Sequence, residues 1–211
     1  MRLLLIRHAQ SSANAEGRMQ GRLDVSLSEQ GRSQSACLAE RLDSMRPVAL
    51  YTSPLLRARE TAEIVSAQVG LPLIDRPGLM ERDVGVLAGL TRGEIMAQFP
   101  EFAAARREGR RVTIEGFEEH EPFSQRVRET FDEILQAHGG GCVAVVTHGG
   151  VVGAFLRWAL EIPPERSGLW SIDNVSVTTI EVAGDARPPS RPRFQLVGLN
   201  DTCHLEEPRG K

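Results

Sequence analysis

The feature that most constrains the fold of this chain is a pattern that occurs three times: a short aliphatic run, a polar residue and a helical segment. The runs lie in RLLLIR (2–7), PVALYTS (47–53) and GCVAVVTH (141–148). Continuous apolar runs of this length are typical of strands buried on both faces. Because strand and helix patterns alternate, we expect an α/β fold, a three-layer sandwich with helices on both faces of a mostly parallel central sheet.

The segments that follow the first two runs carry start and stop signals of helices. Ser28 is a predicted N-cap, and the apolar stripe of its helix includes Cys37. Ser53 is a second predicted N-cap, with Pro54 at the first helical position and Gly70 beyond the end. These signals predict one helix after each of the two strands.

The second half of the chain predicts three more helices. Thr91 and Glu94 have capping-box spacing, and their helix is expected to stop at Pro100. PFSQRVRETFDEILQAHGG (122–140) is amphipathic, and GGVVGAFLRWAL (149–160) begins on glycines. They supply the remaining helices of the two outer layers.

Three further segments have the pattern of strands. LPLID (71–75) is a short extended piece, and NVSVTTIEV (174–182) alternates between apolar and polar residues. RFQLVGL (193–199) is expected to pair with the alternating segment as a hairpin. The last two strands would add an antiparallel edge strand to the sheet.

Length, charge and cysteine content limit the classes of function. The 211 residues suit a single domain, 1–211, and the net charge of −3 argues against a general nucleic-acid binder. No apolar run approaches the roughly 18–20 residues that cross a bilayer, so no membrane partner is expected. Three widely spaced cysteines favour a reducing, cytoplasmic location. Monomer and homodimer both stay open.

Polar residues that could take part in catalysis or ligand binding follow all three aliphatic runs. His8 follows the first run, Ser53 and Arg57 follow the second, and His148 follows the third. Ligands of open α/β sheets bind at the carboxyl ends of the strands. If the strands are parallel, these side chains lie along one rim of the sheet.

These residue types suit the binding and transfer of a phosphate group. Helix N-termini attract anions, and arginine binds phosphate oxygens with a two-pronged fork. The imidazole of His8 has a lone pair that can attack phosphorus, and His148 can donate to the phosphoryl oxygens. Glu81, after a Pro-Gly turn, is a candidate acid for the leaving group. Taken singly, each residue also has an ordinary structural interpretation.

The motifs together resemble the histidine phosphatase superfamily, the phosphoglycerate-mutase-like enzymes. They occur in family order and span nearly the whole chain. The matching segments are LLLIRHAQSSAN (3–14), RMQGRLDVSLSEQGRSQS (18–35), YTSPLLRARETAEIV (51–65), LMERDVGVLAGLT (79–91), VAVVTHGGVV (143–152), NVSVTTI (174–180) and LNDTCHL (199–205).

This resemblance implies a role for each matching residue. His8 is the nucleophile that becomes phosphohistidine, and Glu81 is the proton donor. Arg7, Arg57 and His148 hold the phosphate. The resemblance also implies phosphate or substrate contacts for Asn14, Gln20, Gly21 and Gly149. It implies neither a metal nor another cofactor.

The chain departs from the family pattern at two places. Ala9 and Gln10 stand where the family has Gly-Glu, and the turn after His8 accommodates Ala9 if its backbone φ is negative. In the segment EGFEEHE (115–121), Glu118 matches the glutamate of the family's Gly-Gly-Glu-Ser, and Glu119 replaces the serine.

The function expected from the resemblance is a metal-independent phosphomonoesterase, a histidine acid-type phosphatase acting on small phosphorylated metabolites. Its partners are then a small phosphorylated substrate or inorganic phosphate. The alternative is a bisphosphoglycerate-primed phosphoglycerate mutase, whose motif has tyrosine where this chain has Val84, which cannot donate a hydrogen bond. A third hypothesis is a non-enzymatic binding module that kept the fold. The sequence leaves the natural substrate open.

A charged excursion at about 92–122 is expected to form a lid over the site. Its most basic part has two interpretations: contact with a second anionic group of the substrate, or a solvated helix face. The residues concerned are Arg106, Arg107, Arg110 and Arg111.

Overall fold

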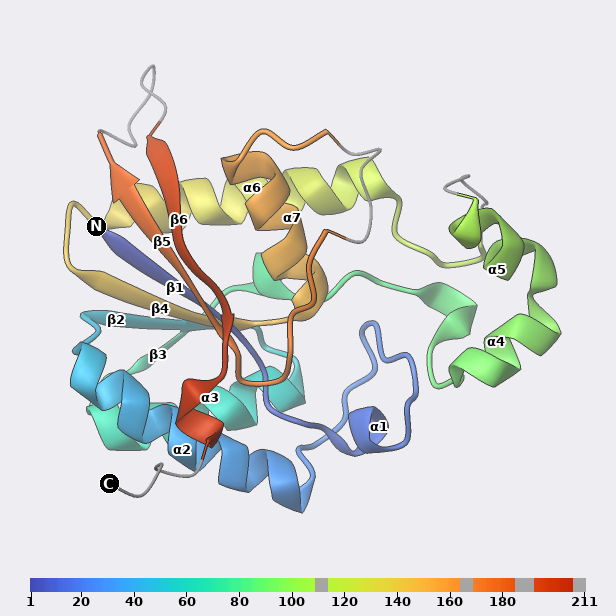
Figure 1. The fold of residues 1–211 in the computed structure, drawn as a ribbon, viewed down its shortest axis with the longest axis horizontal. Coiled ribbons are helices and arrows are strands. Elements are labelled where there is room, and N and C mark those ends of the chain that lie inside the picture. The colour runs from blue at the N-terminus through green and yellow to red at the C-terminus, as the bar shows by residue number, and fades with distance from the viewer. Residues whose placement is uncertain (109–113, 164–168, 185–191, 207–211) are drawn as a thin grey trace.

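The computed structural model describes residues 1–108, 114–163, 169–184 and 192–206, and for Arg106 and Arg107 it describes the backbone alone. A single six-stranded sheet of order β3-β2-β4-β1-β5-β6 forms its centre (Figure 1). The strands are β1 (Arg2–Arg7), β2 (Ala49–Thr52), β3 (Leu73–Asp75), β4 (Cys142–Thr147), β5 (Val177–Ala183) and β6 (Arg193–Asp201).

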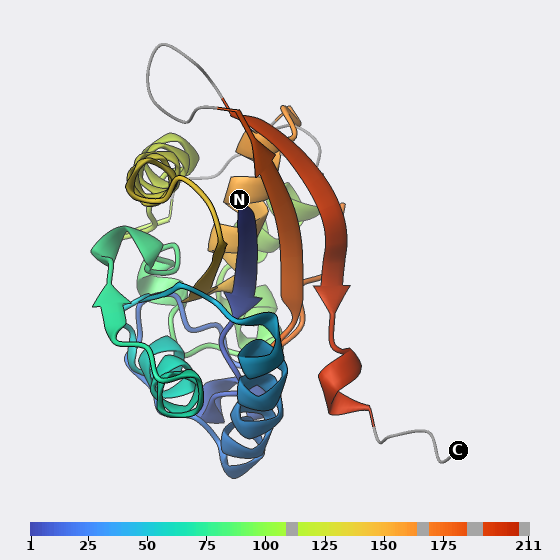
Figure 2. The same ribbon diagram turned by 90° about the vertical axis from the view of Figure 1, so that its left-hand side faces the viewer.

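The strand directions confirm the mixed α/β sheet predicted from the sequence. The first four strands pair in parallel, β1 with β4, β4 with β2, and β2 with β3. β5 runs antiparallel to β1, and β6 runs antiparallel to β5, which makes an antiparallel edge. Figure 2 shows these last two strands side by side in orange and red.

Helices cover both faces of the sheet and bury the aliphatic run of β1 completely. Leu3 and Leu5 of β1 face the apolar cluster that includes α6 (His120–Ala137) and α7 (Gly149–Ala159). Leu4 and Ile6 face the cluster that includes α2 (Glu29–Met45) and α3 (Leu56–Val69). Side chains alternate along a strand, so an apolar residue at every position requires cover on both sides. A continuous apolar run in the sequence therefore indicates a strand that is covered by helices on both faces.

Most of the predicted helix signals are confirmed by the capping geometry. The Ser28 hydroxyl accepts the amide of Gly31 at the start of α2, and Gly70 closes α3 in the left-handed conformation. Thr91 and Glu94 form the reciprocal capping box of α4 (Arg92–Gln98). The remaining short elements are α1 (Ser12–Ala15), η1 (Pro77–Leu79), η2 (Gly85–Leu87) and η3 (Cys203–Leu205).

Three expectations about local positions are wrong. Ser53 does not cap α3, which begins at Leu56 with Leu55 at the N-cap and no side-chain cap. Pro54 therefore precedes the helix and does not occupy its first position. Cys37 is exposed rather than part of the buried stripe of α2. The buried face of α2 includes Leu38 and Leu42, and Cys37 precedes Leu38 by about 100° around the helix.

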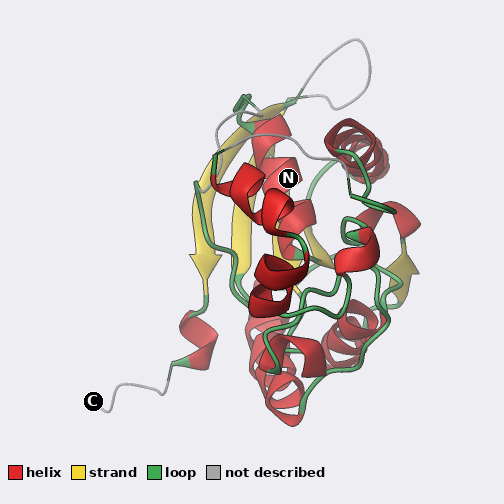
Figure 3. Cartoon of the chain, turned by 90° about the vertical axis from the view of Figure 1, so that its right-hand side faces the viewer, coloured by secondary structure: helices red, strands yellow, loops and turns green. Residues whose placement is uncertain are grey.

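The charged excursion contains more helix than its composition suggests. Pro100 ends α4 as expected, but it also begins α5 (Pro100–Arg107), which packs against α4. Both helices lie outside the layers of the sheet, and Figure 3 views the chain from their side. Arg110 and Arg111 lie outside the described residues, as do the side chains of Arg106 and Arg107. That this segment is a lid stays a prediction. Among the helices that the structure describes, none is long and apolar enough to cross a membrane.

Candidate active site

The carboxyl ends of β1, β4 and β2 meet at one rim, as their parallel register requires. Arg7 pairs with Thr147 in the register of β1 and β4, and Thr52 pairs with Val146 in that of β2 and β4. The residue that follows each strand is therefore brought to the same place. Those residues are His8, Ser53 and His148, all buried.

His8 has its lone pair on Nε2, because the other ring nitrogen is committed to a carbonyl. Its Nδ1 lies 2.7 Å from the carbonyl oxygen of Ala9, which can only accept, so Nδ1 carries the proton. The Nε–H of Arg57 donates to Nε2 at 3.2 Å. The ring thus presents a basic nitrogen in a defined direction.

Burial and two cations keep the His8 imidazole neutral. Desolvation is the largest cause that lowers the pKa of His8 well below its ordinary value, and the charges of Arg57 and Arg7 lower it further. The side chain is 3% exposed. A neutral imidazole is the form in which Nε2 can act as a nucleophile.

Arg57 is a fully buried cation, and each of its three nitrogens donates one hydrogen bond to the protein. Besides His8, it donates to the carbonyl of Leu23 at 2.8 Å and to that of Gly21 at 2.7 Å. Burial lowers the pKa of Arg57 to about 10, so the guanidinium stays charged at neutral pH. The guanidinium of Arg57 thus joins the start of α3 to the loop that contains Gly21. Gly21 itself has φ +52°.

His148 faces His8 across the rim, with ring centroids 5.1 Å apart. Its Nε2 lies 2.8 Å from the hydroxyl of Ser53, which also accepts the amide of Leu55. Among the described residues, that hydroxyl has no other contact that could accept its proton, so it donates to Nε2. The proton of a neutral His148 then sits on Nδ1, a buried atom without a partner in the described part of the chain.

Arg7 adds a second guanidinium on the side of α7. Its Nη1 donates to the carbonyl of Ile172 at 2.6 Å, and desolvation lowers its pKa. A Cβ built at Gly149 would lie 3.6 Å from Cδ of Arg7, which is ordinary contact. Arg7 and Arg57 both lower the pKa of His148, after desolvation as the largest cause. The rim therefore carries one buried and one half-buried cation, Arg57 and Arg7, beside two neutral imidazoles.

Glu81 lies next to these arginine and histidine side chains and binds the N-terminus of α7. Its Oε2 accepts the amide of Gly150 at 3.0 Å, and its Oε1 accepts the amide of Arg82 at 2.8 Å. Its charge raises the pKa of both Arg7 and Arg57. The structure thus brings together all five residues of the predicted core: Arg7, His8, Arg57, Glu81 and His148.

The other predicted contacts lie in the loop next to His8. Asn14 completes the capping box of α1, whose N-cap is Ser11: its Oδ1 accepts from the amide and the hydroxyl of Ser11. Gln20 is buried, and its Oε1 accepts from the same hydroxyl at 2.8 Å. Asn174 donates to the carbonyl of His8 at 2.8 Å and also contacts Asn14 Oδ1 at 3.4 Å. Substrate contact by Asn14, Gln20, Gly21 and Gly149 stays a prediction.

The Ala9-Gln10 departure from the family pattern fits the turn without strain. Ala9 is fully buried, is absent from the residues with positive φ, and donates its amide to the Thr61 hydroxyl at 3.0 Å. The Gln10 side chain accepts from the Ser28 hydroxyl at 2.7 Å. Gln10 is therefore directed to the start of α2 and not towards His148.

An open cavity of about 350 Å³ borders this group on the side of Glu81. The first turns of α7 form one wall, where Gly149 and Gly150 contact Arg7 and Glu81. Arginine, histidine and aromatic side chains form much of the rest, including Arg82, His120, Phe123, Arg157 and Trp170. The described residues contain no group of three or more His, Cys, Asp or Glu side chains that could hold a metal ion.

Sequence reasoning missed four residues that support the site. Asn174 and Thr61 hold the turn around His8, and Gly150 contacts Glu81. Arg126 donates to carbonyls next to Glu81. Asn174 and Thr61 lie within the family-like segments and could have been noticed there. Arg126 offers no such signal, because it looks like any charged residue on an amphipathic helix.

Comparisons with known proteins find related phosphatases in sequence and in structure. The chain is 32% identical to phosphoserine phosphatase 1 of Hydrogenobacter thermophilus, over 98% of this chain and 95% of that protein. It is 38% identical to the metal-independent phosphoserine phosphatase of Arabidopsis thaliana, over 82% and 80%. The structure of a mycobacterial glucosyl-3-phosphoglycerate phosphatase in complex with VO3 superposes with a TM-score of 0.86, at 31% identity, and covers 94% of this chain and 98% of that one. The family model described as "Histidine phosphatase superfamily (branch 1)" matches residues 3–193, so the chain belongs to that superfamily.

Proposed function

We propose that this protein is a metal-independent phosphomonoesterase that works through a phosphohistidine on His8. The observation that carries the proposal is the lone pair of His8 Nε2, which lies beside the charged Arg57 and opposite a buried N–H of His148. Such a site offers a nucleophile together with donors for the phosphoryl oxygens. The membership of the family and the phosphatases among its relatives agree with a phosphoric monoester hydrolase.

In the first step, His8 Nε2 attacks phosphorus while the bond from phosphorus to the ester oxygen breaks. The Arg57 Nε–H leaves Nε2 and donates to a phosphoryl oxygen, as do Arg7 and the Nδ1–H of His148. The leaving oxygen takes a proton from the carboxyl group of Glu81. Both oxygens of Glu81 accept backbone amides in this structure, so one of these contacts is exchanged for the substrate.

In the second step, the same carboxylate takes a proton from water as the water oxygen attacks phosphorus. The P–N bond breaks, its electron pair returns to His8 Nε2, and inorganic phosphate is released. Two guanidinium groups and the donors at the rim balance the phosphate charge. No metal ion or other cofactor is needed for either step.

The leaving group has room in the cavity beside Glu81. The volume of about 350 Å³ suits a small metabolite, and the aromatic and cationic walls suit one that has polar or anionic substituents. The related phosphatases are named for phosphoserine and glucosyl-3-phosphoglycerate, both small phosphorylated metabolites. We place the reaction in the cytoplasm, where the free thiols of Cys37, Cys142 and Cys203 would stay reduced.

The mutase alternative is not favoured by the residues around the acid. Val84 packs against Gly21, where a Cβ would come within 2.5 Å of its methyl group, and offers no hydrogen bond to a phosphoglycerate. A primed exchange assay between 3- and 2-phosphoglycerate tests this alternative directly. Exchange that depends on the bisphosphoglycerate primer and outpaces hydrolysis would favour the mutase.

The proposed function is tested by hydrolysis of p-nitrophenyl phosphate in the presence of EDTA. We expect turnover that survives the chelator and disappears in His8→Ala. Rapid quench should trap acid-labile, base-stable phosphate on the wild-type chain. Chelator-sensitive turnover, or full turnover by His8→Ala, would refute the proposal. A panel of phosphorylated metabolites, with His8→Ala as the blank, then identifies the preferred substrate.

A further inference from the structure

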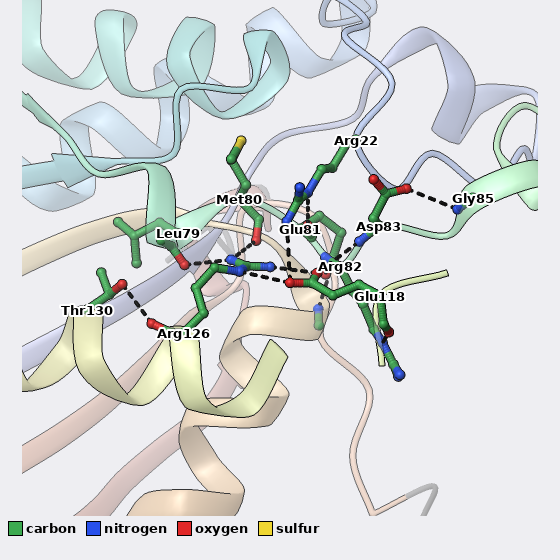
Figure 4. A network of polar contacts seen from close by, with 12 residues as sticks. Arg22, Leu79, Met80, Glu81, Arg82, Asp83, Gly85, Glu118, Arg126 and Thr130 are labelled. Atoms are coloured by element: carbon green, nitrogen blue, oxygen red, sulfur yellow. Dashed lines mark hydrogen bonds and ion pairs between the residues drawn. The ribbon is translucent and has the colours of Figure 1, made fainter. Parts of the chain in front are cut away.

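Arg126 of α6 binds the backbone of the segment that carries Glu81. Arg126 Nη1 donates to the carbonyl of Gly78 at 2.7 Å and to that of Met80 at 2.8 Å. The two carbonyls lie within three residues of Glu81, and one belongs to the residue directly before it. Figure 4 shows the guanidinium reaching from α6 to this segment. The backbone position of the acid thus depends on a side chain from another layer.

The other edge of the same guanidinium is fixed by Glu118. Arg126 Nη2 and Nε lie 2.8 and 3.1 Å from the two carboxylate oxygens of Glu118, a bidentate pair. Both side chains are largely buried, with 20% and 15% of their surface exposed. Burial alone would raise the pKa of Glu118, but hydrogen bonds from Arg126 and from the Asp83 amide outweigh it and lower the pKa. Glu118 is therefore an anion at neutral pH.

Glu118 also binds the chain on the far side of Glu81. Its Oε2 accepts the amide of Asp83 at 3.1 Å, and its own amide donates to the carbonyl of Asp83 at 3.0 Å. The carbonyl of Glu118 accepts from Nε of Arg82 at 2.6 Å. Arg22 contacts Glu118 at 3.3 Å and the carbonyl of Glu81 at 3.5 Å. The residues on both sides of the acid are thus bonded to one pair.

The segment 114–119 is joined to the acid segment by backbone contacts as well. Val84 and Phe117 form an isolated bridge, and Val86 donates to the carbonyl of Glu115 at 3.1 Å. A Cβ at Gly85 would lie 1.9 Å from that same carbonyl oxygen, so the backbones of the two segments are in close contact. Glu118 is therefore the point at which the end of the charged excursion meets both the acid segment and α6.

We infer that Arg126 and Glu118 are positioning residues for Glu81, and that they couple the end of the charged excursion to proton donation. The inference rests on the proposed function, in which Glu81 protonates the leaving group. Neither side chain touches the reacting atoms. Both oxygens of Glu81 bind backbone amides, so a shift of the backbone at 80–82 moves the carboxyl group relative to His8.

A merely structural ion pair predicts a different result from a positioning pair. Loss of a structural pair destabilises the fold and lowers turnover of every substrate by a similar factor. Loss of a positioning pair withdraws the acid and spares reactions that do not need it. p-Nitrophenolate is a stable anion and can leave without being protonated. An alkoxide is a poor leaving group and needs a proton from an acid as the bond breaks. The ratio of kcat/KM for p-nitrophenyl phosphate to that for an alkyl phosphate such as glycerol phosphate therefore separates the two.

The variants that test this inference are Glu118→Gln, which keeps the shape and removes the charge, and Arg126→Lys, which keeps the charge and removes the fork. We expect kcat/KM for glycerol phosphate to fall about 10²-fold in each, and that for p-nitrophenyl phosphate less than about tenfold. kcat/KM is the appropriate quantity because it reports the step that forms phosphohistidine, even where its hydrolysis limits kcat. Folding is checked by circular dichroism and by the midpoint of thermal unfolding.

The matched control is Asp201→Asn, which breaks another half-buried arginine–carboxylate pair. Asp201 binds Arg41 between β6 and α2, on elements that do not touch Glu81. We expect this variant to lose stability while the ratio for the two substrates stays unchanged. The effect of Glu118→Gln on glycerol phosphate should also vanish in a Glu81→Gln background, because there is no acid left to position.

Equal losses for both substrates in Glu118→Gln and Arg126→Lys would overturn the inference, and so would full alkyl-phosphate turnover. Additive effects with Glu81→Gln would overturn it as well. The failure of the proposed function looks different: the wild-type protein would then hydrolyse neither substrate, or His8→Ala would hydrolyse both. If one of the two variants fails to fold, the other decides the outcome.

Discussion

The Nε of Arg57 lies 3.2 Å from Nε2 of His8, at the atom that carries the imidazole lone pair. This contact keeps a cation where the phosphate is proposed to bind, and it also lowers the pKa of the histidine. The other two nitrogens of the same guanidinium are anchored to the carbonyls of Gly21 and Leu23. This side chain thus adds to the effect of burial on the pKa of His8, and it contacts the nucleophilic nitrogen directly.

Replacement of Arg57 by lysine should reduce activity although the charge is kept. A single ammonium group cannot span His8, Gly21 and Leu23 together, so we expect kcat/KM for p-nitrophenyl phosphate to fall by about 10² or more. In Arg57→Met, the pKa of His8 should rise, measured by an NMR titration, because a neighbouring positive charge is gone. Arg59→Lys is the control, since Arg59 is exposed on the same helix. Near wild-type kcat/KM in Arg57→Lys would contradict this account.

Removal of the Ser53 hydroxyl should weaken phosphate binding through His148. In Ser53→Ala, nothing holds the proton of His148 on Nδ1, so the ring can present a lone pair to the phosphate. We expect the inhibition constants of phosphate and vanadate to rise roughly tenfold or more, in line with the loss of a hydrogen bond to a charged group. Ser35→Ala, at a buried hydroxyl bonded to the carbonyl of Gly31, is the matched control. Nitrogen-15 NMR reports the tautomer, and an unchanged Nδ1–H signal in Ser53→Ala would refute the assignment.

The two glycines that begin α7 should respond differently to alanine. A Cβ at Gly150 would lie 2.2 Å from Oε1 of Glu81, whereas a Cβ at Gly149 would meet Arg7 at 3.6 Å. Because the displaced atom is the end of a flexible side chain, Gly150→Ala should fold normally but lose about 10²-fold in turnover of alkyl phosphates. Gly149→Ala keeps its backbone N–H and should stay within a few-fold of wild type. Equal turnover by the two variants would count against the placement of Glu81.

Stability should fall as the pH drops below about 6.5, the ordinary pKa of histidine. The folded pKa values of His8 and His148 are lowered, so the unfolded chain binds protons that the folded chain does not. Above that pH, the two histidines make their full contribution to the free energy of unfolding. It declines by about 1.4 kcal/mol per pH unit for each histidine until the folded value is reached. Urea unfolding at several pH values measures this slope. His8→Ala should show a smaller slope than wild type, and an identical slope would refute the effect.

The sheet and the gathering of the core residues could be predicted because both depend on short-range pattern. A run such as Leu3–Ile6, apolar at every position, requires cover on both faces, and parallel strands bring their carboxyl ends together. His8 and His148 each follow such a run directly, so their proximity follows from the order of elements. Glu81 was already a candidate acid from its residue type, and the motif resemblance added Arg7 and the family.

Local signals failed where a distant partner competed for the same group. Ser53 has the residue type of an N-cap, but its hydroxyl binds His148 and α3 begins three residues later. The capping pattern contains no information about a strand 95 residues further along the chain. Likewise, Arg126 and Glu118 are eight residues apart, but their role comes from contacts with 78–83, which no periodicity records.

The sequence by itself determined which residues stand at the ends of buried strands, since a continuous apolar run and the polar residue that ends it can both be recognised from residue type and spacing. Only the tertiary structure decided which nitrogen of each histidine carries a proton, where Arg57 directs its donors and what holds Glu81 in place. The physical reason is that a buried polar atom must find its partner wherever the folded chain offers one. His8, His148 and Glu81 each have one partner far along the chain, 49, 95 and 69 residues away.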